Sequence, residues 1–181
     1  MELAMGGSLD CLRDGGHYAF EATIALWAVE NLEALAFMGR KGLIHCDVKP
    51  GNILLTADLH VKLCDFGLTK PRLQALAHRF IGTHEYVAPE VYVNPQHNPA
   101  GLPYPLANYN LDTWSLGVTL YKLLSNEYPW PPSAEPHNPE NREEAVRAGH
   151  VAISLDGCPT PKSQNFAISK ELIRIKRKRC W

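Results

Sequence analysis

No run of apolar residues in this 181-residue sequence approaches the ~18 that a membrane-spanning helix needs. An apolar signal segment is also absent from the start, where Glu2, Asp10 and Arg13 accompany two glycine pairs. Neither sign of charge is in excess, because 18 Lys and Arg face 19 Asp and Glu and the net charge is -1. Such a chain has no global field to attract nucleic acid or an anionic membrane. We therefore expect a soluble cytoplasmic protein with no membrane span and no nucleic-acid partner.

Cysteine is sparse, and the five that occur are odd in number, scattered and free of any C-x-x-C pair. They are Cys11, Cys46, Cys64, Cys158 and Cys180. This pattern suggests neither a disulfide framework nor a thiolate zinc site, so a reducing compartment fits best. An apolar content of 45% with 20% charged residues is typical of a globular protein, and the length suffices for one domain with its own core.

Two helices are predicted from the apolar pattern. From Phe20 to Ala36 the apolar residues form one stripe with helical spacing, and Gly39 and Gly42 are expected to end this helix. From Leu111 to Leu124 apolar residues cover nearly every side of a helical wheel, which is typical of a helix surrounded by protein. We interpret the second helix as the central pillar of the domain.

A β-hairpin and several less regular segments complete the predicted organisation. Ile53–Leu55 and Val61–Leu63 flank a polar turn, which predicts the hairpin, and a polar loop precedes it. Asn94–Asn110 contains four prolines, so we expect a surface loop there that could dock a partner. Shorter helices are predicted over Arg142–Ala148 and from Ser169 onward.

The basic run Arg174–Arg179 has two interpretations. The simpler one is the solvated face of a truncated helix. The other is a nuclear localisation signal or a patch for a polyanion, which would make the protein nuclear instead of cytoplasmic.

Polar clusters separated by apolar segments contain the residues suited to chemistry. The first is His-x-Asp-x-Lys-x-x-Asn over His45–Asn52, and Asp65–Gly67 follows, its aspartate thirteen residues after the asparagine. The pattern G-T-x-x-Y-x-A-P-E comes next over Gly82–Glu90, and Asp112 opens D-x-W-S-x-G on the predicted buried helix. Each pattern alone is weak evidence for a function, but four such patterns in this order and spacing are not expected to occur together by chance.

In this order the motifs resemble the C-terminal lobe of the eukaryotic protein kinase superfamily. The resemblance covers the whole chain, since Met1–Ala4 is similar to the hinge and Arg179–Trp181 to the start of a late helix. It implies an α+β, mostly α fold: a helical bundle around a buried central helix, with a small β-hairpin carrying the catalytic loop. Residues 1–181 would then form a partial kinase domain without the N-lobe and the final helices.

The resemblance also implies transfer of the γ-phosphoryl group of ATP, with Mg²⁺, to a protein substrate with a Ser/Thr hydroxyl. Asp47 would accept or orient the proton of that hydroxyl, and Lys49 would reach the transferring phosphate. Asn52 and Asp65 would be the protein ligands of Mg²⁺, which prefers hard oxygen donors. Thr83, together with Lys49, supports serine and threonine as substrates.

The same resemblance implies a nucleotide site and several supporting roles. Glu2, Ala4, Ser8, Asn52, Leu54 and Asp65 would bind ATP, with Leu54 under the adenine ring. His45 and Phe66 would stack, although plain core packing explains them too. Gly67 is expected at a φ that a Cβ would penalise. Asp112 would anchor the catalytic-loop backbone, with a simple helix N-cap as the alternative.

The sequence departs from the family pattern in two places. Cys46 stands where the family usually has Arg, which makes this a non-RD kinase, and Thr69 is the only hydroxyl residue between Asp65 and Gly82. We therefore expect that loop phosphorylation does not switch the protein. No Gly-rich loop or strand lysine is found, so we expect this chain alone to be weakly active or inactive. The alternative function is a catalytically inactive kinase fragment or a pseudokinase-like protein-binding module.

Overall fold

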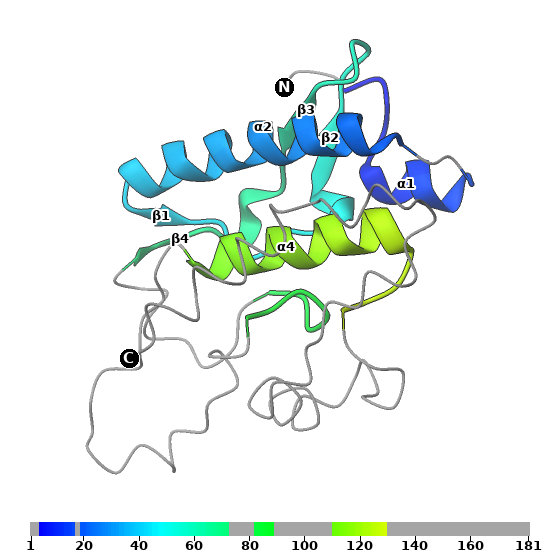
Figure 1. Cartoon of the computed structure of the whole chain (residues 1–181). Coiled ribbons are helices and arrows are strands. Elements are labelled where there is room, and N and C mark those ends of the chain that lie inside the picture. Colours follow the sequence, from blue (N-terminus) through cyan, green and yellow to red (C-terminus); the bar gives the residue numbers. More distant parts are fainter. Residues whose placement is uncertain (1–3, 17–18, 73–81, 89–109, 130–181) are drawn as a thin grey trace.

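The computed structural model describes residues 4–16, 19–72, 82–88 and 110–129 (Figure 1). Its helices are α1 (Leu9–Asp14), α2 (Glu21–Arg40) and α4 (Asn110–Ser125), and short 3₁₀ turns span Pro50–Asn52 and Phe66–Leu68. Its strands are β1 (Leu43–Ile44), β2 (Ile53–Leu55), β3 (Val61–Leu63) and β4 (Lys70–Pro71). No helix in these residues has the length and apolarity to cross a bilayer. The features predicted at Asn94–Asn110, Arg142–Ala148, Ser169 onward and Arg174–Arg179 lie outside the described residues, apart from Asn110, which begins α4.

Helix α2 confirms the first predicted helix, with a small correction at its end. The chain stays helical through Gly39 to Arg40, so Gly39 lies inside the helix and does not end it. Gly42 does match its expected role, because it takes a φ of 73° just beyond the helix. A left-handed residue turns the chain back toward the next strand, and glycine adopts this conformation without a Cβ penalty.

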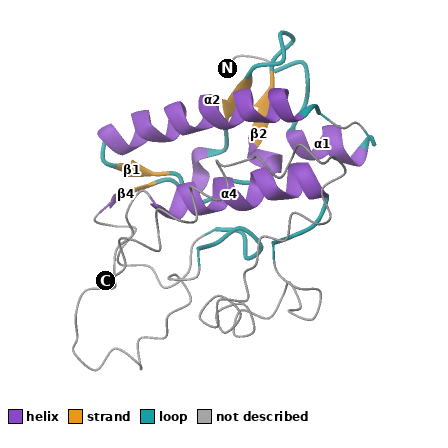
Figure 2. Ribbon diagram, viewed as in Figure 1, coloured by secondary structure: helices purple, strands orange, loops and turns teal. Residues whose placement is uncertain are grey.

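Helix α4 confirms the predicted buried helix. No residue from Leu111 to Ser125 is exposed, and Leu116 and Leu120 are 0% and 1% exposed. Figure 2 shows α2 and α4 as two long, roughly aligned helices with the loops and short strands beside and between them. Ile24 and Trp27 of α2 pack in the same core cluster as the α4 leucines. Burying one such side chain stabilises the fold by roughly 1.5–3 kcal/mol, so this interface holds the two helices together.

The predicted hairpin is confirmed as the antiparallel pair β2 and β3, with Ile53 opposite Leu63. Helix α2 holds its turn, because the Trp27 indole nitrogen donates to the carbonyl of Leu59 at 2.8 Å. The Glu30 carboxylate reaches the same turn and accepts from the Val61 amide at 2.8 Å. A second small sheet, β1 with β4, was not predicted, because two-residue strands have too short a pattern to read.

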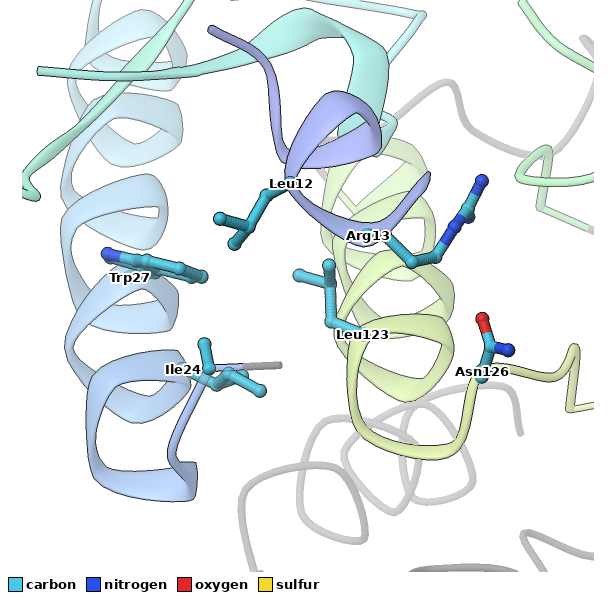
Figure 3. Close-up of a pocket in the computed structure, with 7 residues that line it drawn as sticks. Leu12, Arg13, Ile24, Trp27, Leu123 and Asn126 are labelled. Carbon is cyan, nitrogen blue, oxygen red and sulfur yellow. The ribbon is translucent and has the colours of Figure 1, made fainter. Parts of the chain in front are cut away.

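Two of the cavities lie away from the predicted site residues. The smaller, about 10 Å³, lies where α1, the start of α2 and the end of α4 meet (Figure 3). Its labelled lining residues are Leu12, Arg13, Ile24, Trp27, Leu123 and Asn126. This volume has room for about one water molecule, so it is a packing defect and not a ligand site. The larger, about 450 Å³, lies between α2 and α4 and is lined by Leu32, Leu35, Ala36, Gly39, Arg40 and Thr113.

Candidate functional site

The loop that follows β1 is attached to α4 through Asp112. The two carboxylate oxygens accept from the amides of His45 at 2.8 Å and Cys46 at 2.9 Å. Asp112 is only 3% exposed, so burial raises its pKa, while the two amide hydrogen bonds oppose that rise. The carboxylate therefore lies against the loop backbone, as the anchoring hypothesis expects. The N-cap alternative is wrong, because α4 begins at Asn110 and Asp112 lies within its first turn. It holds Cys46 at a φ of 70°, which an L-residue adopts rarely.

Four of the predicted site residues meet in one hydrogen-bonded group. Asp47 Oδ1 accepts from the Thr83 hydroxyl at 2.6 Å, and Oδ2 accepts from Lys49 Nζ at 2.9 Å. Lys49 Nζ also donates to Thr83 Oγ1 at 2.8 Å, which closes a triangle. Asn52 Nδ2 donates to the Asp47 carbonyl and to Oδ2, both at 2.9 Å. A carboxylate, an ammonium, a hydroxyl and an amide from two distant segments thus share one small volume.

The charge state of Asp47 follows from these partners. Burial of its carboxyl would raise the pKa, but the hydrogen bonds from Thr83, Lys49 and Asn52 and the charge of Lys49 outweigh it. The pKa of Asp47 is therefore held below its ordinary value. The group is an ionised carboxylate at neutral pH, with a cation beside it.

Asp65, at the start of the turn that follows β3, makes none of the hydrogen bonds described for this group. Its carboxylate is exposed and accepts from the Gly67 amide at 3.3 Å. The turn is nevertheless tied to the loop, because the Cys64 amide donates to the Asn52 carbonyl at 2.9 Å. His45 Nε2 bonds the Cys64 carbonyl at 3.0 Å, which adds a second tie directly before Asp65.

Two expectations about this turn are wrong. Gly67 does not take a positive φ; Asp65 does, at 59°. A Cβ at position 67 would lie 3.1 Å from Asp65 Oδ1, the end of an exposed side chain that can move aside, so space restricts this position only mildly. Phe66 is not a core residue, since it is 55% exposed, although its ring does lie against His45 with centroids 5.2 Å apart. His45 itself is fully buried, as core packing predicts.

Three of the predicted nucleotide residues, Ala4, Ser8 and Leu54, lie on β2 and in the segment beside it. Ser8 bridges to Leu54, and the Gly6 amide donates to the Leu55 carbonyl at 2.9 Å, so residues 6–8 extend the β2 edge. Ser8 also caps α1, because its hydroxyl accepts from the Cys11 amide. Ala4 is half-buried just ahead of this segment, and Glu2 lies outside the described residues.

Two donor groups fit a hard divalent cation. Asn52 uses its amide nitrogen for Asp47, so its oxygen is the end that a metal would take. Asp65 presents an exposed carboxylate. In the part of the chain that the structure describes, no three His, Cys, Asp or Glu side chains gather as a metal site. A cation held here would have two protein ligands and would complete its shell with water and phosphate oxygens, which is the usual arrangement for Mg²⁺.

The thiol of Cys46 is partly buried and stays protonated at neutral pH. Burial and the nearby charge of Asp112 raise the pKa of Cys46 to about 12. Its Sγ lies 3.6 Å from the carbonyl of Ile44 and bonds there. Cys46 is therefore a neutral side chain at neutral pH and offers no charge to an anion.

Two contacts were not foreseen from the sequence. Glu30 and Trp27 join α2 to the hairpin turn. The sequence pattern did not predict the Glu30 contact, because a glutamate on a helix is expected to face solvent. Gly82 was noted only as part of a motif. A Cβ built on it would lie 2.4 Å from the Cys46 carbonyl oxygen, and its φ of 110° could have been suspected from glycine alone.

Comparison with known proteins gives a consistent result. A family model described as protein kinase domain matches residues 1–178. MAP kinase kinase skh1/pek1 of Schizosaccharomyces pombe is 37% identical over 140 residues, 75% of this chain and 36% of that protein. cGMP-dependent protein kinase 2 of Rattus norvegicus is 37% identical over 132 residues, which cover 72% of this chain and 16% of that protein. MAP kinase kinase MKK1/SSP32 of Saccharomyces cerevisiae is 37% identical over 134 residues, which cover 71% of this chain and 24% of that protein. The chain thus spans about a third or less of the length of these relatives.

Proposed function

Because the chain belongs to the protein kinase family, we propose that it phosphorylates serine and threonine residues of proteins with ATP and Mg²⁺. We propose further that residues 1–181 are the hinge and C-terminal lobe of such a domain. The observation that carries the proposal is the triangle of Asp47, Lys49 and Thr83, with Asn52 bonded to the same carboxylate. Phosphoryl transfer requires mainly positioning and charge neutralisation, and this group supplies both.

Asp47 acts on the substrate hydroxyl. Because its pKa is held low, its carboxylate is a weak base, and its main work is to orient the hydroxyl and accept the proton late. Lys49 places a cation 2.9 Å from that carboxylate, where it also neutralises charge that develops on a phosphoryl oxygen.

Thr83 supports serine and threonine as the substrate class. Its hydroxyl bonds both Asp47 and Lys49, so the segment that carries it is held against the catalytic loop. In the family, lysine and threonine at these two positions accompany Ser/Thr specificity.

Asn52 and Asp65 would hold Mg²⁺, and Ala4, Ser8, Leu54 and Glu2 would line the nucleotide site. The cation, when bound, shields the phosphate oxygens as the transferring group passes between two oxyanions. The bridge between Ser8 and Leu54 supports this placement, because it sets the segment that follows the proposed hinge beside the strand that carries Leu54.

The protein is proposed to be of the non-RD type, without a phosphorylation switch in the loop after Asp65. The neutral thiol of Cys46 cannot pair with a phosphate, and the hydroxyl oxygen of Thr69 is buried. Phosphatase treatment should therefore leave phosphoryl transfer unchanged, and a large loss of activity would refute this part.

The test is transfer of radiolabelled γ-phosphate from ATP to a mixed serine and threonine peptide library by the full chain. Transfer should require Mg²⁺, and Asp47→Asn should reduce it by about a hundredfold or more. Asp58→Asn is the matched control, because Asp58 is an exposed carboxylate in the hairpin turn, outside the site. No transfer and no Mg²⁺-dependent nucleotide binding would instead favour a pseudokinase-like binding module.

A further inference from the structure

Gly82 lies directly on the backbone of the catalytic loop. A Cβ on this residue would be 2.4 Å from the Cys46 carbonyl oxygen and 3.1 Å from Val87 Cγ2, and its φ is 110°. Real Cβ atoms do not approach a backbone oxygen to 2.4 Å. Both the space and the φ therefore restrict position 82 to glycine.

The carbonyl that Gly82 meets has little freedom to move. Cys46 donates its amide to Asp112 at 2.9 Å, and the preceding amide of His45 donates to the same carboxylate. The Cys46 thiol bonds the Ile44 carbonyl, while the atoms of Cys46 nearest a Cβ on Gly82 are its carbonyl oxygen and carbon. Any strain at this contact must therefore be relieved by a shift of the segment that carries Gly82.

The other end of the 82–88 segment is also held. Ser115 of α4 donates its hydroxyl to the Tyr86 carbonyl at 2.8 Å, and the Thr83 carbonyl accepts from the amides of Tyr86 and Val87. The segment is thus a short turn attached to α4, and Gly82 is the residue at which it contacts the backbone of the catalytic loop. Thr83, the next residue, donates its hydroxyl to Asp47 at 2.6 Å.

We propose that Gly82 is a positioning residue: its backbone rests on the Cys46 carbonyl and so sets Thr83 in hydrogen-bond contact with Asp47 and Lys49. The catalytic loop and the 82–88 segment then meet at a backbone contact, between Gly82 and the carbonyl of Cys46. The inference rests on the proposed kinase function, since it names how that site is assembled.

The experiment compares Gly82→Ala with Gly16→Ala in the full chain. Gly16 also has a positive φ, 72° against 110° at Gly82, and nothing within 4 Å of its would-be Cβ, so it is the control for a positive φ without a steric clash. Gly82→Ala should lower kcat by about a hundredfold, as expected for a displacement of about 1 Å, while the KM for ATP stays near the wild-type value. Gly16→Ala should leave both unchanged.

A second readout does not depend on activity. The pKa of the Asp47 carboxyl, followed by carbon NMR, should rise in Gly82→Ala because the Thr83 hydrogen bond to the ionised form is lost. In a Thr83→Ala background the Gly82→Ala change should add little to either kcat or this pKa. Additive effects would overturn the proposal, because they would mean that Gly82 does not act through Thr83.

The remaining outcomes separate this inference from the proposed function. If the wild-type chain transfers no phosphoryl group, the proposed function fails, yet the Asp47 titration still tests Gly82. If transfer occurs and Gly82→Ala changes neither kcat nor the Asp47 pKa, only the positioning role is refuted. Should Gly82→Ala fail to fold by circular dichroism, Val87→Ala is added to make room, and the same shift of the Asp47 pKa is expected.

Discussion

Replacing Asp112 by alanine should lower the free energy of unfolding by about 2–4 kcal/mol. The change leaves two amides, those of His45 and Cys46, without their acceptor. An unsatisfied buried donor costs about 1–3 kcal/mol, and the half-buried Cys46 amide can recover part of this by bonding water. Removal of a carboxylate that is 3% exposed relieves its own desolvation cost, which offsets a further part.

Urea unfolding followed by circular dichroism measures this difference from the midpoint shift at constant m value. Asp58→Ala is the control, because Asp58 is exposed in the hairpin turn and should change stability by no more than about 0.5 kcal/mol. Asp112→Asn should fall between the two, since its amide oxygen can still accept from one backbone amide. A loss below about 1 kcal/mol for Asp112→Ala would refute the reasoning, because the loop would then be held at its positive φ by other contacts.

Two further predictions concern the edge of the fold. Gly6→Ala should destabilise by about 1–3 kcal/mol in the same assay, because the new Cβ would lie 2.6 Å from Leu55 Cβ, whereas Gly117→Ala has open space and should not. Glu30→Gln should lower the pKa of His60 toward its ordinary value by proton NMR, since the bond to Glu30 raises that pKa. The stabilisation from charged His60 is present below the pKa of His60 in the unfolded chain and is lost as pH rises through its pKa in the folded protein. An unchanged His60 pKa in Glu30→Gln would contradict the proposed effect of Glu30 on His60.

The elements with a long local pattern were predictable. The apolar stripe of α2 and the all-round apolar surface of α4 each repeat over several turns, and the hairpin carries its own turn residues. The pairing of β1 with β4 was not, because each strand has two residues and the partners are far apart in sequence. Gly39 was misread as a helix end, since glycine in a packed helix is tolerated when neighbouring contacts compensate.

The candidate site was predictable as a set of residues and less so as an arrangement. Motif order selected Asp47, Lys49 and Thr83, and their hydrogen bonds now join them. The ring contact expected between His45 and Phe66 did form. The core burial of Phe66 and the positive φ of Gly67 failed, because exposure and φ depend on what packs around a turn and not on its residue types.

The order of residues along this chain was enough to set its two long helices, its hairpin and the chemical inventory of the site. Those features depend on spacing over a few residues, which the geometry of helix and strand converts directly into a buried face. Only the tertiary structure decided which distant groups meet. Asp112 bonds an amide 67 positions away, and Gly82 rests on the carbonyl of Cys46. Such contacts arise from the close packing of whole elements, in which the position of each backbone atom depends on all its neighbours.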